Sequence, residues 1–70
     1  MKKDKYNSFG YFVIIEVNGK VACVKFADNF KSFAKKRMQE AIEEHKAKGL
    51  HGIAKLTSGK SGKVWEHIEF

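Results

Sequence analysis

The 70-residue sequence contains no proline, a single cysteine and a single arginine. Cys23 has no second cysteine with which to form an intramolecular disulfide or a cysteine-based zinc site, so we expect a reducing, cytoplasmic environment. The longest apolar run is Tyr11–Ile15, far shorter than the roughly 20 residues that a membrane-spanning helix needs. The first ten residues lack the apolar stretch of a secretory signal. The sequence therefore predicts neither a membrane span nor secretion.

Combinations of residues that carry catalysis or bind metal are also missing. The three histidines have no paired spacing, and a metal site would need at least that. Glu66 and Glu69 fall on opposite faces of one expected strand and cannot act together as a carboxylate pair. The segment 58–63 reads SGKSGK but lacks the earlier glycine and the following helix of a phosphate-binding loop. We therefore expect no enzymatic activity, no metal and no cofactor.

Charge, by contrast, is abundant and unevenly distributed. Fourteen basic and eight acidic residues give a net charge of +6. All of this net charge lies in the first 37 residues, because the remainder holds equal numbers of each sign. Four basic residues, at positions 31 and 35–37, fall at the start of an expected helix, where the helix dipole disfavours each by ~0.3–1 kcal/mol. Such a cluster is either an ordinary solvated face or a surface that meets an anionic partner.

Two strands are expected on either side of Asn18-Gly19, at residues 11–17 and 21–27. Both segments are rich in β-branched and aromatic residues, and the Asn-Gly dipeptide tolerates the positive φ angles of a type I′ turn. A two-residue turn fixes the pairing of the strands. A regular register predicts the pairs Val17–Lys20, Ile15–Ala22, Val13–Val24 and Tyr11–Phe26 on one face, and Phe12–Lys25, Ile14–Cys23 and Glu16–Val21 on the other.

An amphipathic helix of about five turns is expected from Phe30 onward. Apolar residues recur there at spacings of three and four, which gathers them on one stripe of a helix. Asp28 or Asn29 can cap the start of the helix. Gly49 can end it in the left-handed conformation, with Leu50 folding back onto the last turn.

The remaining segments, 51–57 and 63–70, flank a loop rich in Gly and Ser and are expected to form a second hairpin. The order ββαββ predicts an α+β fold, a four-stranded antiparallel sheet with one amphipathic helix packed on one face and the other face open. Residues 1–10 are expected to form a basic flexible arm, and 11–70 a single domain. The predicted core consists of Tyr11, Val13, Ile15, Val24, Phe26, Phe30, Phe33, Ala34, Met38, Ile42, Leu56 and Ile68.

Two surfaces are candidates for binding. The first is a lysine-rich face suited to phosphate, since Lys is a hydrated point charge and lacks the planar fork with which Arg reads guanine. Its residues are Lys2, Lys3, Lys5, Lys25, Lys31, Lys35, Lys36, Arg37, Lys60 and Lys63. The second is the open sheet face, where exposed apolar side chains usually mark a protein interface or a homodimer and less often a platform that stacks bases. Its candidate partner-binding residues are Phe12 and Ile14, with Trp65 and His67 if the last strand turns them outward.

From these surfaces we expect a small, non-enzymatic basic module that docks on nucleic acid or on a nucleic-acid-handling complex. The alternative is a protein–protein interaction factor that uses the apolar sheet face. In size, charge and element order the chain resembles the small stand-alone proteins with which bacteriophages and mobile elements block host or defence complexes, and this resemblance implies an inhibitor. A twofold homodimer is also expected, because one helix leaves an open face unburied.

Overall fold

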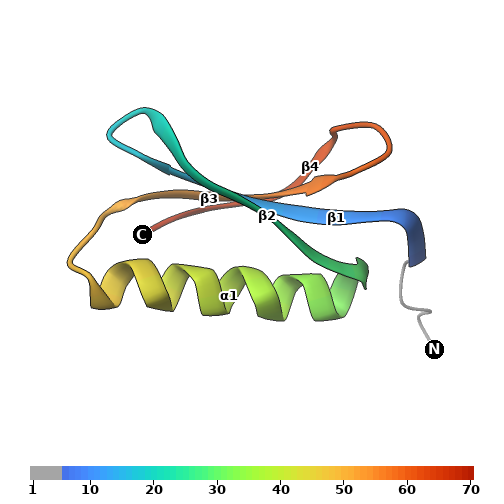
Figure 1. Ribbon diagram of the computed structural model, residues 1–70, viewed down its shortest axis with the longest axis horizontal. Helices are drawn as coiled ribbons and strands as arrows, with labels where there is room; N and C mark the ends of the chain where they lie inside the picture. The colour runs from blue at the N-terminus through green and yellow to red at the C-terminus, as the bar shows by residue number, and fades with distance from the viewer. Residues whose placement is uncertain (1–5) are drawn as a thin grey trace.

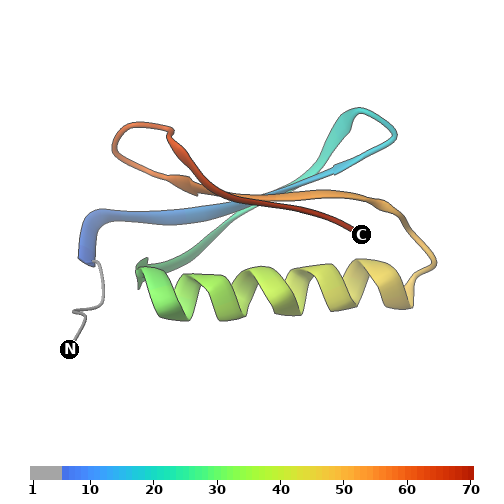
Figure 2. The same ribbon diagram turned by 180° about the vertical axis from the view of Figure 1, so that it is seen from behind.

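The computed structural model describes residues 6–70 and has the order β1 (Tyr6–Val17), β2 (Lys20–Phe30), α1 (Lys31–Ala47), β3 (Gly52–Ser58) and β4 (Val64–Glu69). The four strands form one antiparallel sheet in the order β2-β1-β3-β4. The helix lies along one face of this sheet, and the tips of both hairpins rise away from the helix (Figures 1 and 2). The predicted α+β fold with a helix on one face is confirmed. Within residues 6–70, no helix has both the length and the apolar character needed to cross a membrane.

The first hairpin has the predicted turn and a different register. Asn18 and Gly19 both have positive φ, 55° and 78°, as a type I′ turn requires. The pairing is regular for the first two pairs beyond the turn, and a bulge at Ala22 then adds one residue to β2, so that Ile15 pairs with Cys23 instead of with Ala22. An extra residue moves the side chains that follow it to the opposite face, here from Cys23 to Phe26, where a second extra residue, Ala27, precedes the pair Tyr11–Asp28. The predicted register is therefore wrong beyond Ala22.

This bulge explains two errors in the predicted core. Val24 and Phe26 lie on the open face and are 58% and 52% exposed. Cys23 packs against the core on the helix side, and Lys25 takes the position opposite Val13. Phe30 and Phe33 are exposed as well, because they lie at the end of the molecule where the chain passes from sheet to helix. The buried core consists of Tyr11, Val13, Ile15, Ala27, Ala34, Met38, Ala41, Ile42, Ala54 and Leu56, with Ile68 partly buried against it.

The first strand begins earlier than predicted. Tyr6–Gly10, which we expected in the flexible arm, belong to β1, so the boundary at residue 10 is wrong, and the rest of the arm lies outside the described residues. Gly10 is a strand irregularity with φ of 80°, and the ring of Phe26 fills the space that a Cβ atom would occupy. The Gly10 carbonyl accepts a hydrogen bond from the Gly59 amide (2.9 Å). This bond ties the start of β1 to the β3–β4 turn.

The two helix ends differ in how well the sequence predicts them. The predicted caps are wrong, because Phe30 is the N-cap residue and makes no side-chain capping bond. Asp28 instead accepts a hydrogen bond from the Phe30 amide (3.0 Å), and the Asn29 side chain donates to the backbone of β1 (2.9 Å). The C-terminal prediction is confirmed. Gly49 has φ of 77°, and the Leu50 amide donates back into the last turn (3.0 Å).

The second hairpin contains a bulge at Trp65. Thr57 pairs with Val64 and Leu56 pairs with Glu66, so Trp65 has no residue opposite it in β3. Its side chain packs against the core, within reach of the helix. His67 pairs with Lys55 on the open face. The prediction that Trp65 shares the open face with His67, Phe12 and Ile14 is therefore wrong, because the bulge separates the faces of Trp65 and His67.

Candidate functional site

At one end of the molecule β1 begins, β2 passes into the helix, and the β3–β4 turn lies above them (Figure 1). Lysine and aromatic side chains from these segments contact one another there. The Asn7 side chain, near the start of β1, donates a hydrogen bond to Ser58 Oγ (2.8 Å) and joins two of these segments. We call this region the lysine–aromatic end. Its members are Tyr6, Phe9, Phe30, Lys31, Phe33, Lys35, Lys36, Lys60, Lys63 and Trp65.

Trp65 brings two lysines from different elements to one place. The Lys31 ammonium, from the first turn of the helix, lies 4.5 Å from the centre of the indole ring. The Lys63 ammonium, from the β3–β4 turn, lies 4.3 Å from the same centre. Both distances fall within the range of a cation–π interaction, which holds each ammonium against the ring without neutralising its charge. The half-buried indole thus has two positive charges against its ring.

Two further lysines lie beside exposed phenylalanines. The Lys36 ammonium is 6.0 Å from the ring centre of Phe33, and the Lys60 ammonium is 6.0 Å from that of Phe9. Phe33 is 49% exposed and Phe9 61% exposed. Phe33 also makes an edge contact with Phe30, at 6.2 Å between ring centres, and Phe30 contacts Tyr6 at 5.1 Å. The end therefore presents both cations and aromatic rings to solvent.

The other predicted basic residues are placed differently. Lys35 lies 3.4 Å from Glu66, and Arg37 lies 3.2 Å from Glu40 on the next turn of the helix, so a carboxylate already faces each of them. Such exposed ion pairs contribute little to stability. Lys25 follows the Ala22 bulge and is on the helix side of edge strand β2. Lys2, Lys3 and Lys5, which were also predicted to bind phosphate, lie outside the described residues.

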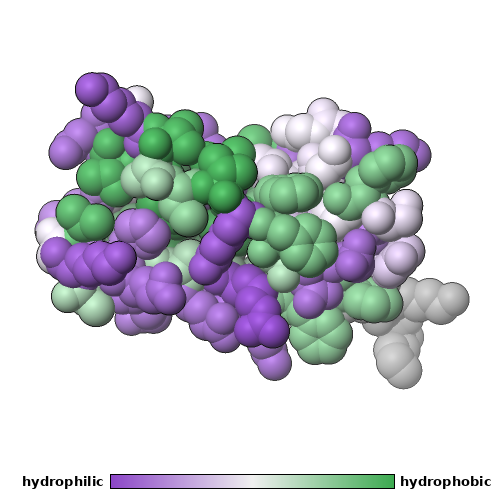
Figure 3. All heavy atoms as spheres, viewed as in Figure 1, coloured by the Kyte–Doolittle hydropathy of each residue, from purple (hydrophilic) through white to green (hydrophobic). Residues whose placement is uncertain are grey.

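The open sheet face forms a second exposed surface. Phe12 and Ile14 lie on it as predicted, but the residues that expose the most apolar surface are Val21, Val24, Phe26 and Val64, each about half exposed. Val21 was predicted on this face, whereas Val24 and Phe26 were predicted in the core because the Ala22 bulge was not foreseen. Figure 3 shows hydrophobic side chains in two groups, one over the β1–β2 hairpin and one at the end where the helix begins. A salt bridge between Lys55 and Glu16 (3.0 Å) crosses the open face.

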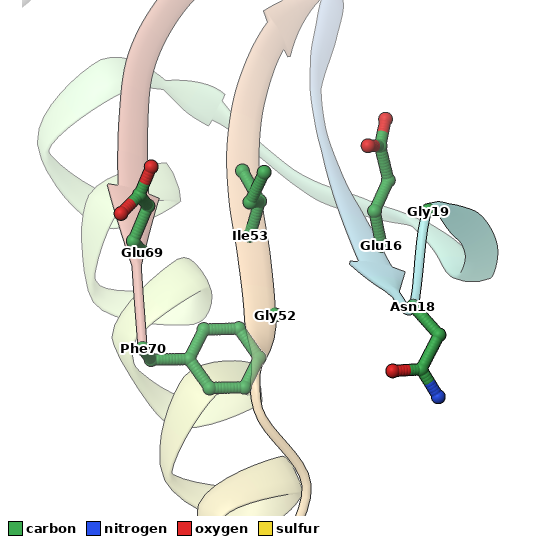
Figure 4. A pocket seen from close by; sticks show the side chains of 7 residues that line it. All are labelled: Glu16, Asn18, Gly19, Gly52, Ile53, Glu69 and Phe70. Carbon is green, nitrogen blue, oxygen red and sulfur yellow. The ribbon is translucent and has the colours of Figure 1, made fainter.

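A shallow depression of about 320 Å³ lies by the β1–β2 turn. Figure 4 shows the side chains of Glu16 and Glu69 on either side of Ile53, on three neighbouring strands. Two carboxylates and no basic side chain line the depression, and Glu16 is paired with Lys55. Among residues 6–70, no three His, Cys, Asp or Glu side chains are grouped so that they could hold a metal ion. The depression therefore offers neither a metal site nor a cationic surface.

Four of the predicted phosphate-binding residues thus lie beside aromatic rings at the lysine–aromatic end. Lys31 and Lys63 meet at Trp65, Lys36 lies beside Phe33, and Lys60 lies beside Phe9. Comparisons with protein-family models, with curated proteins and with solved structures found no match to this chain.

Proposed function

We propose that the protein is a non-enzymatic binding module that docks on nucleic acid through the lysine–aromatic end. The observation that supports this proposal is the presence, at one end of the molecule, of four lysine ammoniums from the helix start and the β3–β4 turn, each beside an aromatic ring. Phosphates attract lysines without regard to base sequence, and the release of their counterions provides the free energy of binding. With a net charge of +6, the chain is attracted to a polyanion over distances of about a Debye length.

The helix start adds to this proposal. The first turn of α1 contains no acidic residue, although acidic residues are the ones that the positive end of the helix dipole stabilises. It contains Lys31, and Lys35 and Lys36 follow within the next turn. The local electrostatics are therefore unfavourable in the free protein, and an anion bound here removes part of that repulsion.

Salt dependence with charge-reversal variants tests the proposal. The change is Lys36→Glu with Lys60→Glu, because both side chains are exposed and each ammonium lies beside an exposed phenylalanine. The matched control is Lys46→Glu with Lys48→Glu, at the other end of the helix. For the wild type, we expect log K to fall linearly with log salt. For the first variant we expect the slope to shrink by roughly 0.7 to 0.9 for each phosphate that the protein no longer neutralises.

Two results of this experiment contradict the proposal. One is binding to nucleic acid that does not weaken between low and moderate salt. The other is an equal loss of affinity in the two variants, because the lysines of the lysine–aromatic end would then contribute no more to binding than lysines elsewhere on the helix. The protein retains its fold in either variant if far-ultraviolet circular dichroism matches that of the wild type.

A second candidate function is that of a protein–protein interaction factor that uses the open sheet face. Val24, Phe26 and Val64 are half exposed there, and exposed apolar clusters mark protein interfaces more often than nucleic-acid sites. Capture from a lysate with and without nuclease distinguishes the two functions. Partners released by nuclease treatment favour the first function. Partners that resist nuclease and no longer bind a Val24→Glu variant favour the second.

A further inference from the structure

Resting on the proposed function, we infer that the lysine–aromatic end takes single-stranded nucleic acid and stacks unpaired bases on Phe9 and Phe33. Phosphate attraction alone does not distinguish a duplex from a single strand. The distinction comes from the aromatic rings, because a duplex hides the faces of its bases within the stack, whereas a single strand presents them.

The exposure of these rings is the first step of the argument. Phe9 and Phe33 stand about half open to solvent or more, although burying a Phe side chain is among the most favourable contributions to folding. Phe33 and its neighbour Phe30 meet edge to face, with an angle of 87° between the ring planes. A contact of this kind covers less of a ring face than a parallel stack does. Ring surface at this end is therefore available to a flat partner.

The distance between ring and cation is the second step. Each of the two phenylalanines has one lysine ammonium 6.0 Å from its ring centre, Lys36 for Phe33 and Lys60 for Phe9. A nucleotide carries its phosphate one sugar away from its base. A base stacked on the ring therefore brings its own phosphate within reach of the adjacent ammonium. Two such pairs, one on the helix and one between β1 and the β3–β4 turn, each offer a nucleotide a ring and a cation.

The scarcity of groups free to read base edges is the third step, because the side-chain amides of Asn7 and Asn29 at this end already make hydrogen bonds within the protein. The sequence has one arginine, Arg37, and its guanidinium is already engaged by Glu40. Stacking tolerates any base because every base has a π face, whereas edge recognition depends on groups such as Arg. The strand bound here is therefore recognised by its chemistry and not by its sequence.

Trp65 supplies the measurement. It is the one tryptophan of the chain, and the ammoniums of Lys31 and Lys63 lie against its ring. A phosphate that draws either lysine away changes the surroundings of the indole and hence its fluorescence. The protein is titrated at low salt with four probes of equal length: oligothymidylate, oligouridylate, a DNA duplex, and an abasic strand that keeps the phosphates and lacks bases.

We expect oligothymidylate, oligouridylate or both to bind about tenfold or more tightly than the duplex and the abasic strand, in line with the cost of removing one stacked base. In a Phe9→Ala, Phe33→Ala variant this preference disappears while affinity for the abasic strand stays unchanged. The matched control, Val24→Ala with Val64→Ala, removes apolar groups of similar exposure from the open face and keeps the preference. Phe33→Leu, which retains apolar volume without a π face, repeats the test if the double variant does not fold.

The outcomes separate the inference from the proposed function. Equal affinity for the duplex, the abasic strand and the single strands, or an unaltered preference in the phenylalanine variants, overturns single-strand stacking and leaves nucleic-acid docking in place. Loss of the preference in the valine control moves stacking to the open face and also overturns the inference. Binding of none of the four probes overturns the proposed function itself.

Discussion

At the scale of single residues, Phe33 illustrates how a residue of suitable spacing can lie outside the core. It precedes the buried Ala34 by one position, which places it about 100° around the helix from that residue. We predict that Phe33→Ala lowers the free energy of unfolding by less than about 1 kcal/mol, whereas Met38→Ala lowers it by about 2–5 kcal/mol because Met38 is fully buried. Urea denaturation of the two variants measures the difference, and a larger loss for Phe33→Ala contradicts the described packing.

Gly10 is a second residue whose role depends on its backbone. Its φ of 80° is a conformation that other L-residues rarely adopt, and the Phe26 ring occupies the place of a Cβ atom. We therefore predict that Gly10→Ala destabilises the protein by about 1–3 kcal/mol through backbone strain and displacement of that ring. Gly19→Ala has the same kind of strain with open space around it and serves as the control. If the two variants melt at the same temperature, the ring contact contributes nothing.

At the scale of elements, the bulge at Ala22 decides which side chains of β2 face the helix. Ala22 is the extra residue between Val21, opposite Glu16, and Cys23, opposite Ile15. Deletion of Ala22 makes this pairing regular and leaves every other β2 side chain on its present face. We predict that the deletion variant folds cooperatively, with a free energy of unfolding within about 1–2 kcal/mol of the wild type. In a hairpin without a bulge, the same deletion would move the side chains beyond it to the opposite face of the sheet. A deletion variant that does not fold would therefore contradict the presence of the bulge at Ala22.

The elements also show where prediction from sequence succeeds. Asn18-Gly19 and Gly49 were predicted correctly because a turn or a helix end with positive φ is fixed by the residues within it. The N-cap of the helix was not predicted correctly. The side chain of Asn29, one of the two expected caps, donates a hydrogen bond to the backbone carbonyl of Asn7, which is far away in the sequence. The bulges at Ala22 and Trp65 were also not predicted. They depend on contacts between distant segments, because the packing of the whole sheet on the helix selects them.

The candidate site was also predicted only in part from the sequence. The lysines of the helix start and of the β3–β4 turn were identified from charge alone, although their convergence on Trp65 depends on the bulge in β4. The exposed rings of Phe9 and Phe33 were missed. The sequence pattern placed Phe9 in an arm and Phe33 in the core, and only the arrangement of the sheet relative to the helix exposes them together.

At the scale of the whole molecule, the lysines beside exposed rings and the open sheet face are separate surfaces. The lysine–aromatic end is cationic, whereas the open face is apolar and its Lys55 and Glu16 neutralise each other. If two copies pair through the open face, the net charge of +6 on each opposes pairing. Higher salt screens that repulsion. We therefore predict that any self-association strengthens with salt while nucleic-acid binding weakens. Sedimentation velocity at two salt concentrations tests this prediction. Self-association that weakens as salt rises would contradict pairing through the open face.

The central claim is that nucleic acid binds at the lysine–aromatic end, and nuclear magnetic resonance of the ¹⁵N-labelled protein tests it most directly. On addition of a short single-stranded oligonucleotide, we predict that the largest shifts occur at the backbone amides of residues 30–36 and 58–65 and at the indole N–H of Trp65. The amides of Val24, Ile53 and the helix end near Lys48 should move little. Shifts concentrated on the open sheet face, or no shifts at a saturating concentration of oligonucleotide, would contradict the account.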